Sequence, residues 1–260
     1  MDFEKSRVVV WYSCGVTSAV AAKLAISKYK DKLPIEIVYT DTGSEHPDNK
    51  RFIKDCEKWF KHPVKILKSE KYGDIWEVFK KTRYLAGVNG ARCTTELKKK
   101  LRHDFQNVWS DIQVFGFDAG EEKRAERFRA NNPEVTLETP LIDKNLTKAD
   151  CLAMVDRAGI ELPAMYRLGY QNNNCIGCVK GQSGYWNKIR KDFPDVFDRM
   201  AKVERELNVA INKSYAGDGK RKRVFLDELD PNAGRYKDEP DIECSLLCIQ
   251  AEQEIEDCGE

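Results

Sequence analysis

From Arg7 onward, short runs of β-branched and aliphatic residues alternate with longer stretches in which apolar residues recur at helical spacing. This alternation is typical of a parallel sheet whose strands are joined by helices. The short runs predict five strands, over residues 8–12, 35–39, 64–67, 112–116 and 135–139. The helical spacing predicts four helices, over residues 18–29, 47–60, 94–105 and 147–158. We therefore expect a doubly wound α/β fold with a mainly parallel sheet flanked by helices.

The alternation ends near Leu162. The rest of the chain contains an Asn-rich loop with two cysteines, a helical segment around 184–207 and a charged tail with three further cysteines. No strand pattern is visible in it, and 216–223 and 227–239 are typical of exposed loops. We expect an α/β domain over 1–162 and a helical, cysteine-containing C-terminal subdomain over 163–260.

The composition is that of a soluble globular protein, with 260 residues of which 41% are hydrophobic and 33% charged. The apolar run at 8–12 is much shorter than the roughly 20 residues of a membrane helix, and the first seven residues are too charged for a signal peptide. We therefore expect a cytoplasmic protein without a membrane partner. The net charge of +1 argues against a uniformly basic nucleic-acid binder.

Small polar residues follow the first predicted strand. Ser13, Gly15, Thr17 and Ser18 can offer hydroxyls and backbone amides at a helix start, where a phosphate or sulfate binds favourably. The alternative is an ordinary turn with a capping serine. Ligands of an open parallel sheet bind at the carboxyl ends of its strands, so this position favours an anion site.

Two other predicted strands also end in polar residues. Asp41 and Thr42 follow the second strand and can contact a ribose, an adenine amine or a phosphate-bound metal, although Asp41 also suits a turn or helix cap. Gly116 follows the fourth strand and is succeeded by Glu121 and Arg124. Surface ion pairs are the alternative explanation for these last two charges.

Nine cysteines in a cytoplasmic chain indicate metal binding or thiol chemistry more than a disulfide framework. Cys175 and Cys178 form a CxxC in a predicted turn, which suits an iron–sulfur cluster, a structural zinc ion or redox thiols. Cys56 and Cys151 fall within predicted helices and are expected to be core residues. Cys14 is either packed in the core or faces a ligand.

Four sequence elements, in this order, resemble one known family. The loop Ser13-Cys14-Gly15-Val16-Thr17-Ser18 resembles the SGGxDS loop of the adenine nucleotide α-hydrolase superfamily, which includes ATP pyrophosphatases and phosphoadenylylsulfate (PAPS) reductases. Residues 92–98 resemble the RCTxxLK element of the PAPS reductase-like branch, and 116–124 its G-x-x-x-x-E-x-x-R element. Residues 140–150 resemble its PL-I…T-x-x-D stretch. The resemblance covers roughly residues 7–205.

The resemblance implies an adenine nucleotide as substrate, either an adenylyl-sulfate or ATP. The implied nucleotide and sulfate ligands are Ser13, Gly15, Thr17, Ser18, Asp41, Thr42, Arg92, Lys98, Gly116, Glu121 and Arg124. One departure matters, because Thr17 stands where the ATP pyrophosphatases carry aspartate. This departure argues against magnesium-assisted cleavage of ATP but not against nucleotide binding.

The family resemblance also assigns roles to the cysteines. It implies a 4Fe–4S cluster held by Cys93, Cys175, Cys178 and either Cys244 or Cys248, with zinc as the alternative metal. The last residues are Glu256-Asp257-Cys258-Gly259-Glu260, which are similar to the short C-terminal E-C-G segment that carries the nucleophilic cysteine of PAPS reductases. Cys258 is therefore the implied catalytic thiol, and a thioredoxin-type protein the implied reductant.

These observations support three functional hypotheses. The first is a PAPS reductase-like enzyme that reduces a bound adenylyl-sulfate to sulfite. The second is an ATP-dependent sulfur-transfer enzyme that modifies a nucleic-acid substrate through a cysteine-bound iron–sulfur cluster. The third is a nucleotide-binding regulator without catalytic activity. Thr17 favours the first hypothesis, and the combination of the RCT element with the CxxC favours the second.

Overall fold

The computed structural model describes residues 4–87, 90–215, 221–240 and 242. These residues fold into two compact units. The first contains the chain up to Asp41, then His46–Lys68 and Lys100–Asn173. The second contains Thr42–Glu45, Ser69–Lys99 and the chain from Asn174 onward. The domain boundary at residue 162 stays a prediction.

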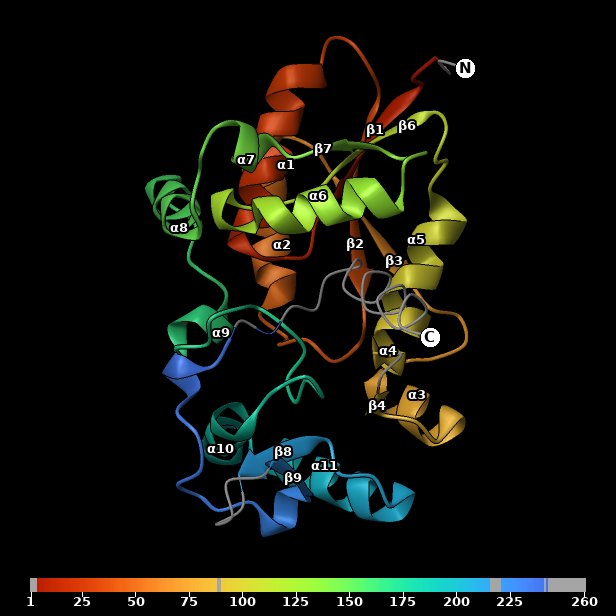
Figure 1. Cartoon of the computed structure of the whole chain (residues 1–260). Coiled ribbons are helices and arrows are strands. Elements are labelled where there is room, and N and C mark those ends of the chain that lie inside the picture. The colour runs from red at the N-terminus through yellow and green to blue at the C-terminus, as the bar shows by residue number, and fades with distance from the viewer. Residues whose placement is uncertain (1–3, 88–89, 216–220, 241, 243–260) are drawn as a thin grey trace. The chain divides into compact units, whose positions relative to one another are not determined.

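The first unit is built on a five-stranded parallel sheet, in the order β3-β2-β1-β6-β7. The strands are β1 (Arg7–Trp11), β2 (Ile35–Asp41), β3 (Val64–Lys68), β6 (Asp111–Val114) and β7 (Thr136–Glu138). The doubly wound α/β prediction is therefore confirmed, and all five predicted strands are present. Strand β1 lies in the middle of the sheet (Figure 1).

Helices connect the strands of the first unit. They are α1 (Val16–Tyr29), α2 (Asn49–Phe60), α5 (Lys100–Phe105), η2 (Ala119–Glu121), α6 (Glu122–Asn131), α7 (Pro140–Asp143), α8 (Lys148–Arg157) and α9 (Ala164–Arg167). Helix α8 begins with a capping box between Thr147 and Asp150. Among the helices that the structure describes, none has the length and apolarity needed to cross a bilayer.

Both faces of the sheet are covered. Because successive side chains of a strand point in opposite directions, strand β1 packs against both covering layers. Val8, Val10 and Tyr12 belong to one buried cluster with apolar residues of α1, α2 and α8. On the opposite face, the Trp11 ring packs edge-on against Phe105 of α5, with 6.0 Å between centroids. The central strand is thus buried on both sides, which fixes the position of the loop that follows it.

Two cysteines lie in this core, as the sequence predicts. Cys56 and Cys151 are both 0% exposed. Burial raises the pKa of each thiol to about 12. Because a thiolate is the reactive form of cysteine, these two thiols are chemically inert near neutral pH.

The second unit combines short helices with two hairpins. Its elements are α3 (Ile75–Thr82), β4 (Ala86–Gly87), β5 (Gly90–Ala91), α4 (Arg92–Thr94), the π-helix η1 (Thr95–Lys99), α10 (Ser183–Asp192), α11 (Pro194–Leu207), β8 (Asn212–Tyr215), β9 (Arg221–Val224), η3 (Leu226–Glu228) and η4 (Tyr236–Asp238). The predicted helix over 94–105 is confirmed as helical throughout, although it is divided among α4, η1 and α5. One prediction was wrong, because the C-terminal part does contain an antiparallel hairpin, β8–β9.

Glu204 of α11 holds both ends of the β8–β9 hairpin. Its carboxylate accepts hydrogen bonds from the N–H groups of Ile211, at 2.7 Å, and Leu226, at 2.6 Å. The side chain is fully buried, and this burial raises the pKa of Glu204 to about 7. The hairpin is therefore attached to the helix through a carboxyl group that titrates near neutral pH.

This raised pKa predicts that the protein is less stable at pH 8 than at pH 5. The folded protein holds the Glu204 proton more tightly than the unfolded chain, whose carboxyl has a pKa of 4.5. The contribution is fully present below pH 4.5 and is lost as the pH rises through about 7. The loss amounts to about 3 kcal/mol of unfolding free energy.

Urea unfolding at pH 5 and pH 8 measures this loss. We expect Glu204→Gln, which cannot ionise, to reduce the difference between the two pH values. Glu206→Gln changes an exposed glutamate of the same helix and should leave the difference as it is. An equal pH dependence in all three proteins would contradict the assignment to Glu204.

Candidate functional site

Helix α1 begins directly after a turn formed by Ser13, Cys14 and Gly15. Gly15 is the N-cap residue, with an extended backbone (φ −104°, ψ 163°), and no side chain caps the helix. The first turn also contains no acidic residue. The first amides of an α-helix have no partner within the helix and form the positive end of its dipole. This helix start can therefore bind a phosphate or sulfate without displacing a carboxylate.

The hydroxyl groups of this loop have different roles. Ser18 Oγ donates to the Gly15 carbonyl at 2.9 Å and accepts from the Ser13 N–H at 3.1 Å, and the residue is buried. Ser13 is exposed and Thr17 is half-buried. Ser18 therefore shapes the turn from the inside, whereas Ser13 and Thr17 are accessible to a ligand.

Cys14 adopts the left-handed backbone conformation, with φ 61°, which is uncommon for a residue with a side chain. The residue is 0% exposed. Its thiol donates to the Asn49 carbonyl at 3.7 Å and accepts from the Tyr12 hydroxyl at 3.9 Å. Of the two alternatives that the sequence left open, the structure favours the packed residue over a thiol that faces a ligand.

Gly116, two residues after β6, lies against the start of α1. A Cβ atom at this position would be 2.7 Å from both the N and Cα atoms of Ser18 and 3.0 Å from the carbonyl carbon of Thr17. These are backbone atoms, so a side chain at position 116 would displace the helix start. The role that the structure gives Gly116 is to let the loop approach the neighbouring strand.

The charged residues predicted at this edge of the sheet have partners within the first unit. The Asp41 carboxylate lies 2.7 Å from Lys68 Nζ. Glu121 pairs with Arg124 and also accepts from the Asp118 N–H at 3.1 Å. Burial raises the pKa of Glu121. An anionic ligand would therefore meet Arg124 as a cation that is already paired.

The second unit brings together three other predicted site residues, Thr42, Lys98 and Cys175, around Glu45. Cys175 Sγ lies 3.1 Å from Thr42 Oγ1 and 3.7 Å from Glu45 Oε1. The Glu45 carboxylate accepts from the Thr42 N–H at 3.2 Å and lies 4.0 Å from Lys98 Nζ. Glu45 and Lys98 side chains are 6% and 12% exposed. Arg92, also in this unit, instead pairs with the buried Glu96 at 2.9 Å.

The CxxC turn is held by the hydroxyl group of Tyr185. This oxygen accepts from the N–H groups of Gly177, at 3.0 Å, and Cys178, at 2.9 Å, and donates to the Cys175 carbonyl at 3.3 Å. Tyr185 and Trp186 are 2% and 0% exposed. Both rings are therefore packed inside the subdomain, and neither is open to a nucleic-acid base.

Three of the five predicted metal ligands lie among the residues that the structure describes. Cys175 and Cys178 are buried and Cys93 is half-buried. Among the residues that the structure describes, no three His, Cys, Asp or Glu side chains lie close enough to hold a metal ion. Cys244, Cys248 and Cys258 lie outside the described residues. The described cysteines do not form the predicted ligand set by themselves, and the set that includes Cys244 or Cys248 stays a prediction.

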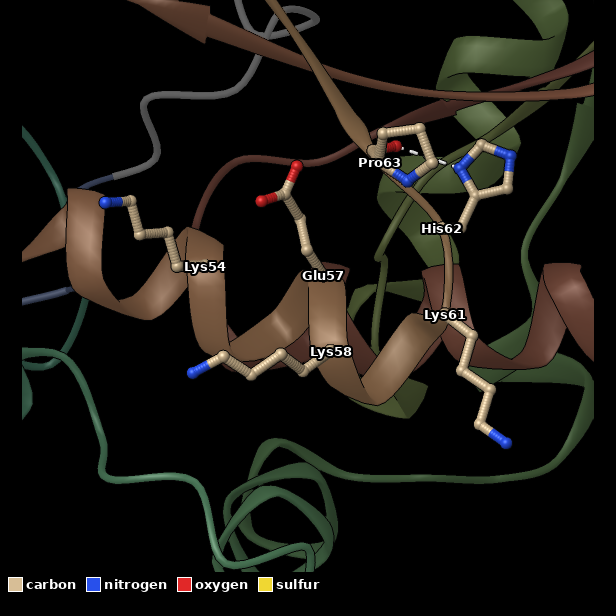
Figure 2. Close-up of a pocket in the computed structure, with 6 residues that line it drawn as sticks. All are labelled: Lys54, Glu57, Lys58, Lys61, His62 and Pro63. Carbon is tan, nitrogen blue, oxygen red and sulfur yellow. Dashed lines mark hydrogen bonds between the residues drawn. The ribbon is translucent and has the colours of Figure 1, made fainter.

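A surface hollow of about 520 Å³ lies at the C-terminal end of α2 (Figure 2). It is lined by Lys54, Glu57, Lys58, Lys61, His62 and Pro63. The Glu57 carboxylate accepts from the Val64 N–H at 2.8 Å and so joins α2 to β3. Asn49, which contacts the loop, lies at the other end of this helix, so the hollow does not coincide with the candidate anion site.

Sequence reasoning missed several residues that contact the predicted ones. Glu45, Asn49 and Asn173 were not predicted, although the run of three asparagines at 172–174 is visible in the sequence. Their importance comes from contacts with residues far away in the chain, such as the 130-residue separation between Glu45 and Cys175. A single sequence carries no signal for such pairs.

Comparison with known proteins identifies one family model and two sequence relatives. A model of the phosphoadenosine phosphosulfate reductase domain matches residues 7–184. The chain is 23% identical over 223 residues to an uncharacterized protein of Methanocaldococcus jannaschii, a match that covers 83% of this chain and 44% of that protein. It is 27% identical over 243 residues to an uncharacterized nin region protein of Escherichia phage lambda, covering 82% and 77%. The chain thus spans less than half of the first relative's length.

Two solved structures are similar to part of the chain. PAPS reductase from Candida auris, in a phosphate complex, aligns with a TM-score of 0.47 and 15% identity over 66% of this chain and 82% of that one. The U34-tRNA thiolase NcsA from Methanococcus maripaludis, with its 4Fe–4S cluster, aligns with a TM-score of 0.44 and 16% identity over 80% and 74%. These similarities are too low to transfer a ligand or a reaction.

Proposed function

The chain belongs to the phosphoadenosine phosphosulfate reductase domain family, and from this premise we propose that it binds an adenylyl-sulfate and reduces its sulfate group through a cysteine thiol. The start of α1 carries the proposal. It has no acidic residue in its first turn, and Ser13 and Thr17 beside it are accessible. We assign to this loop the phosphate that is joined to the sulfate.

Thr17 favours this substrate over cleavage of ATP. The corresponding position is an aspartate in the ATP pyrophosphatases that the loop resembles, and a carboxylate is a suitable ligand for phosphate-bound magnesium. Threonine offers a neutral hydroxyl instead. A neutral residue also leaves the helix start free of negative charge that would repel the ligand.

The proposed reaction moves two electrons from a dithiol to the sulfate sulfur. The Cys258 thiolate attacks this sulfur, the bond to the phosphate oxygen breaks, and the nucleotide leaves with the electron pair. One thiol of a thioredoxin-type protein then attacks the Cys258 sulfur of the resulting S-sulfocysteine, and sulfite leaves with the electron pair of the S–S bond. The second thiol reduces the mixed disulfide and restores Cys258.

The start of α1 would act on the first of these steps. Negative charge grows on the phosphate oxygen as its bond to sulfur breaks, and fixed amides at a helix start stabilise such charge. We assign a supporting electrostatic role to Arg124, which belongs to the same compact unit as α1 and pairs with Glu121. No step is assigned to a metal ion or cluster.

The test is a sulfite-release assay with PAPS, adenylyl-sulfate and thioredoxin, using the full chain. We expect sulfite release from one of the two substrates and its loss in Cys258→Ser. Glu252→Gln, a change in the same tail, should retain the rate. Cleavage of ATP to AMP and pyrophosphate without sulfite release would overturn the proposal, and unchanged release by Cys258→Ser would remove this thiol from the reaction.

A second candidate is ATP-dependent sulfur transfer to a nucleic acid, and the buried Cys175 thiol beside Thr42 and Glu45 favours it. It requires that the protein, purified without oxygen, contain iron and sulfide on Cys93, Cys175, Cys178 and Cys244 or Cys248. Metal analysis and the absorbance near 400 nm distinguish the cluster from zinc. Nucleotide binding without turnover of either substrate would instead indicate a regulator.

A further inference from the structure

The side chain of Asn173 contacts the loop at the start of α1. Its Nδ2 atom donates hydrogen bonds to the Cys14 carbonyl, at 2.7 Å, and to Asn49 Oδ1, at 2.8 Å. Asn173 and Asn49 are 7% and 4% exposed, so both hydrogen bonds are shielded from water. All three residues belong to the first compact unit.

These contacts hold a backbone conformation that is unfavourable by itself. Cys14 has a side chain and a φ of 61°, and a left-handed residue of this kind costs about 1 kcal/mol or more. Such a conformation persists only where its surroundings fix it. Here the Asn173 amide fixes the Cys14 carbonyl, and the Asn49 carbonyl accepts from the Cys14 thiol at 3.7 Å.

Fixing this carbonyl also fixes the direction of an amide on the ligand-binding loop. The peptide unit is planar and trans, so its C=O and N–H groups point in opposite directions. The peptide between Cys14 and Gly15 therefore directs the Gly15 N–H away from Asn173. This N–H belongs to the N-cap residue of α1, next to the amides of the first turn.

We propose that Asn173 is a positioning residue for the phosphate group of the ligand, because it holds the Cys14 carbonyl and thereby directs the Gly15 N–H toward that phosphate. The inference rests on the proposed function, since it assumes that this loop binds a nucleotide phosphate. It adds a residue that belongs to none of the sequence elements that resemble the family.

The asparagine run supplies matched controls for this role. The neighbouring Asn172 accepts from Lys148 Nζ at 2.7 Å, and Asn174 donates to the Ile242 carbonyl at 2.7 Å. The three side chains are chemically identical and consecutive, but their contacts differ. A change at each position removes the same amide group from a different partner.

The experiment measures the affinities of the full chain for AMP and for adenosine by titration calorimetry. Asn173→Ala and the similarly shaped Asn173→Leu remove the donor, and we expect each to weaken AMP binding at least tenfold. Adenosine binding should change less than twofold, because adenosine has no phosphate. Asn172→Ala and Asn174→Ala should bind both ligands as the unaltered protein does.

Each other outcome overturns the inference. Unchanged AMP affinity in the Asn173 variants would show that the amide does not position the loop. An equal loss of AMP and adenosine binding would indicate a general structural role. If both variants fail to fold, Asn49→Ala, which removes the acceptor for Asn173, must still weaken AMP binding more than adenosine binding. If the unaltered protein binds neither ligand, the proposed function itself fails, and this inference with it.

Discussion

Replacing Gly116 by alanine is expected to weaken adenine-nucleotide binding about a hundredfold. The added methyl group would lie 2.7 Å from backbone atoms of Ser18, which no rotation of a side chain can relieve. The start of α1 must move, and its amides then no longer face the phosphate. The same overpacking should lower the unfolding free energy by about 1–3 kcal/mol. Calorimetric titration with AMP and urea unfolding measure the two effects.

Gly120→Ala is the matched control for this variant. A Cβ atom at Gly120 would approach only Asp118 Oδ1, at 3.3 Å, which is the end of a side chain that can move. Its nucleotide affinity should therefore stay close to that of the unaltered protein. A folded Gly116→Ala protein with full affinity for AMP would show that the loop beside Gly116 does not bind the nucleotide.

Asp111→Ala is expected to lower the unfolding free energy by about 3 kcal/mol. The Asp111 carboxylate is 0% exposed and accepts from Arg7 Nε, at 2.8 Å, and Nη2, at 3.0 Å. It also accepts from the Asn107 N–H at 2.7 Å. The variant leaves a partly buried guanidinium and a backbone donor without this acceptor. Urea unfolding measures the loss.

A second ion pair on the same sheet provides the comparison. Glu36 and Lys65 lie 3.3 Å apart, with side chains that are 35% and 48% exposed. Glu36→Ala should cost less than about 1 kcal/mol, because water and salt screen exposed pairs. Asp111 lies at the amino end of β6, whereas Gly116 follows its carboxyl end. Nucleotide affinity of the folded Asp111→Ala protein should therefore be retained, and a large loss would contradict this separation.

The parallel sheet was predictable because burial on both faces leaves β-branched runs such as Val8–Val10. The β8–β9 hairpin was not, because its exposed Lys213, Lys222 and Arg223 do not alternate with apolar residues. That hairpin is held by Glu204 from a preceding helix. The alternation of apolar and polar residues cannot reveal a strand pair that is held by a carboxylate outside the two strands.

The π-helical turn within the predicted helix over 94–105 was not predictable for a different reason. Apolar spacing indicates that a segment is helical, but it does not show where one turn widens into a π-helix such as Thr95–Lys99. The helix start after Gly15 could be predicted from local residue types, and its role as an anion site stays a prediction. The contacts of Asn173 and Glu45 could not be predicted, because their partners lie more than a hundred positions away in the chain.

The chain passes between its two compact units five times, after Asp41, Glu45, Lys68, Lys99 and Asn173. Neither unit is therefore encoded by one continuous stretch of the gene. A recombination between relatives with a single crossover would leave at least one unit assembled from parts of both parents. Exchange of one whole unit requires three separate segments to be transferred together, so chimaeric proteins that test the role of each unit must be designed with several junctions.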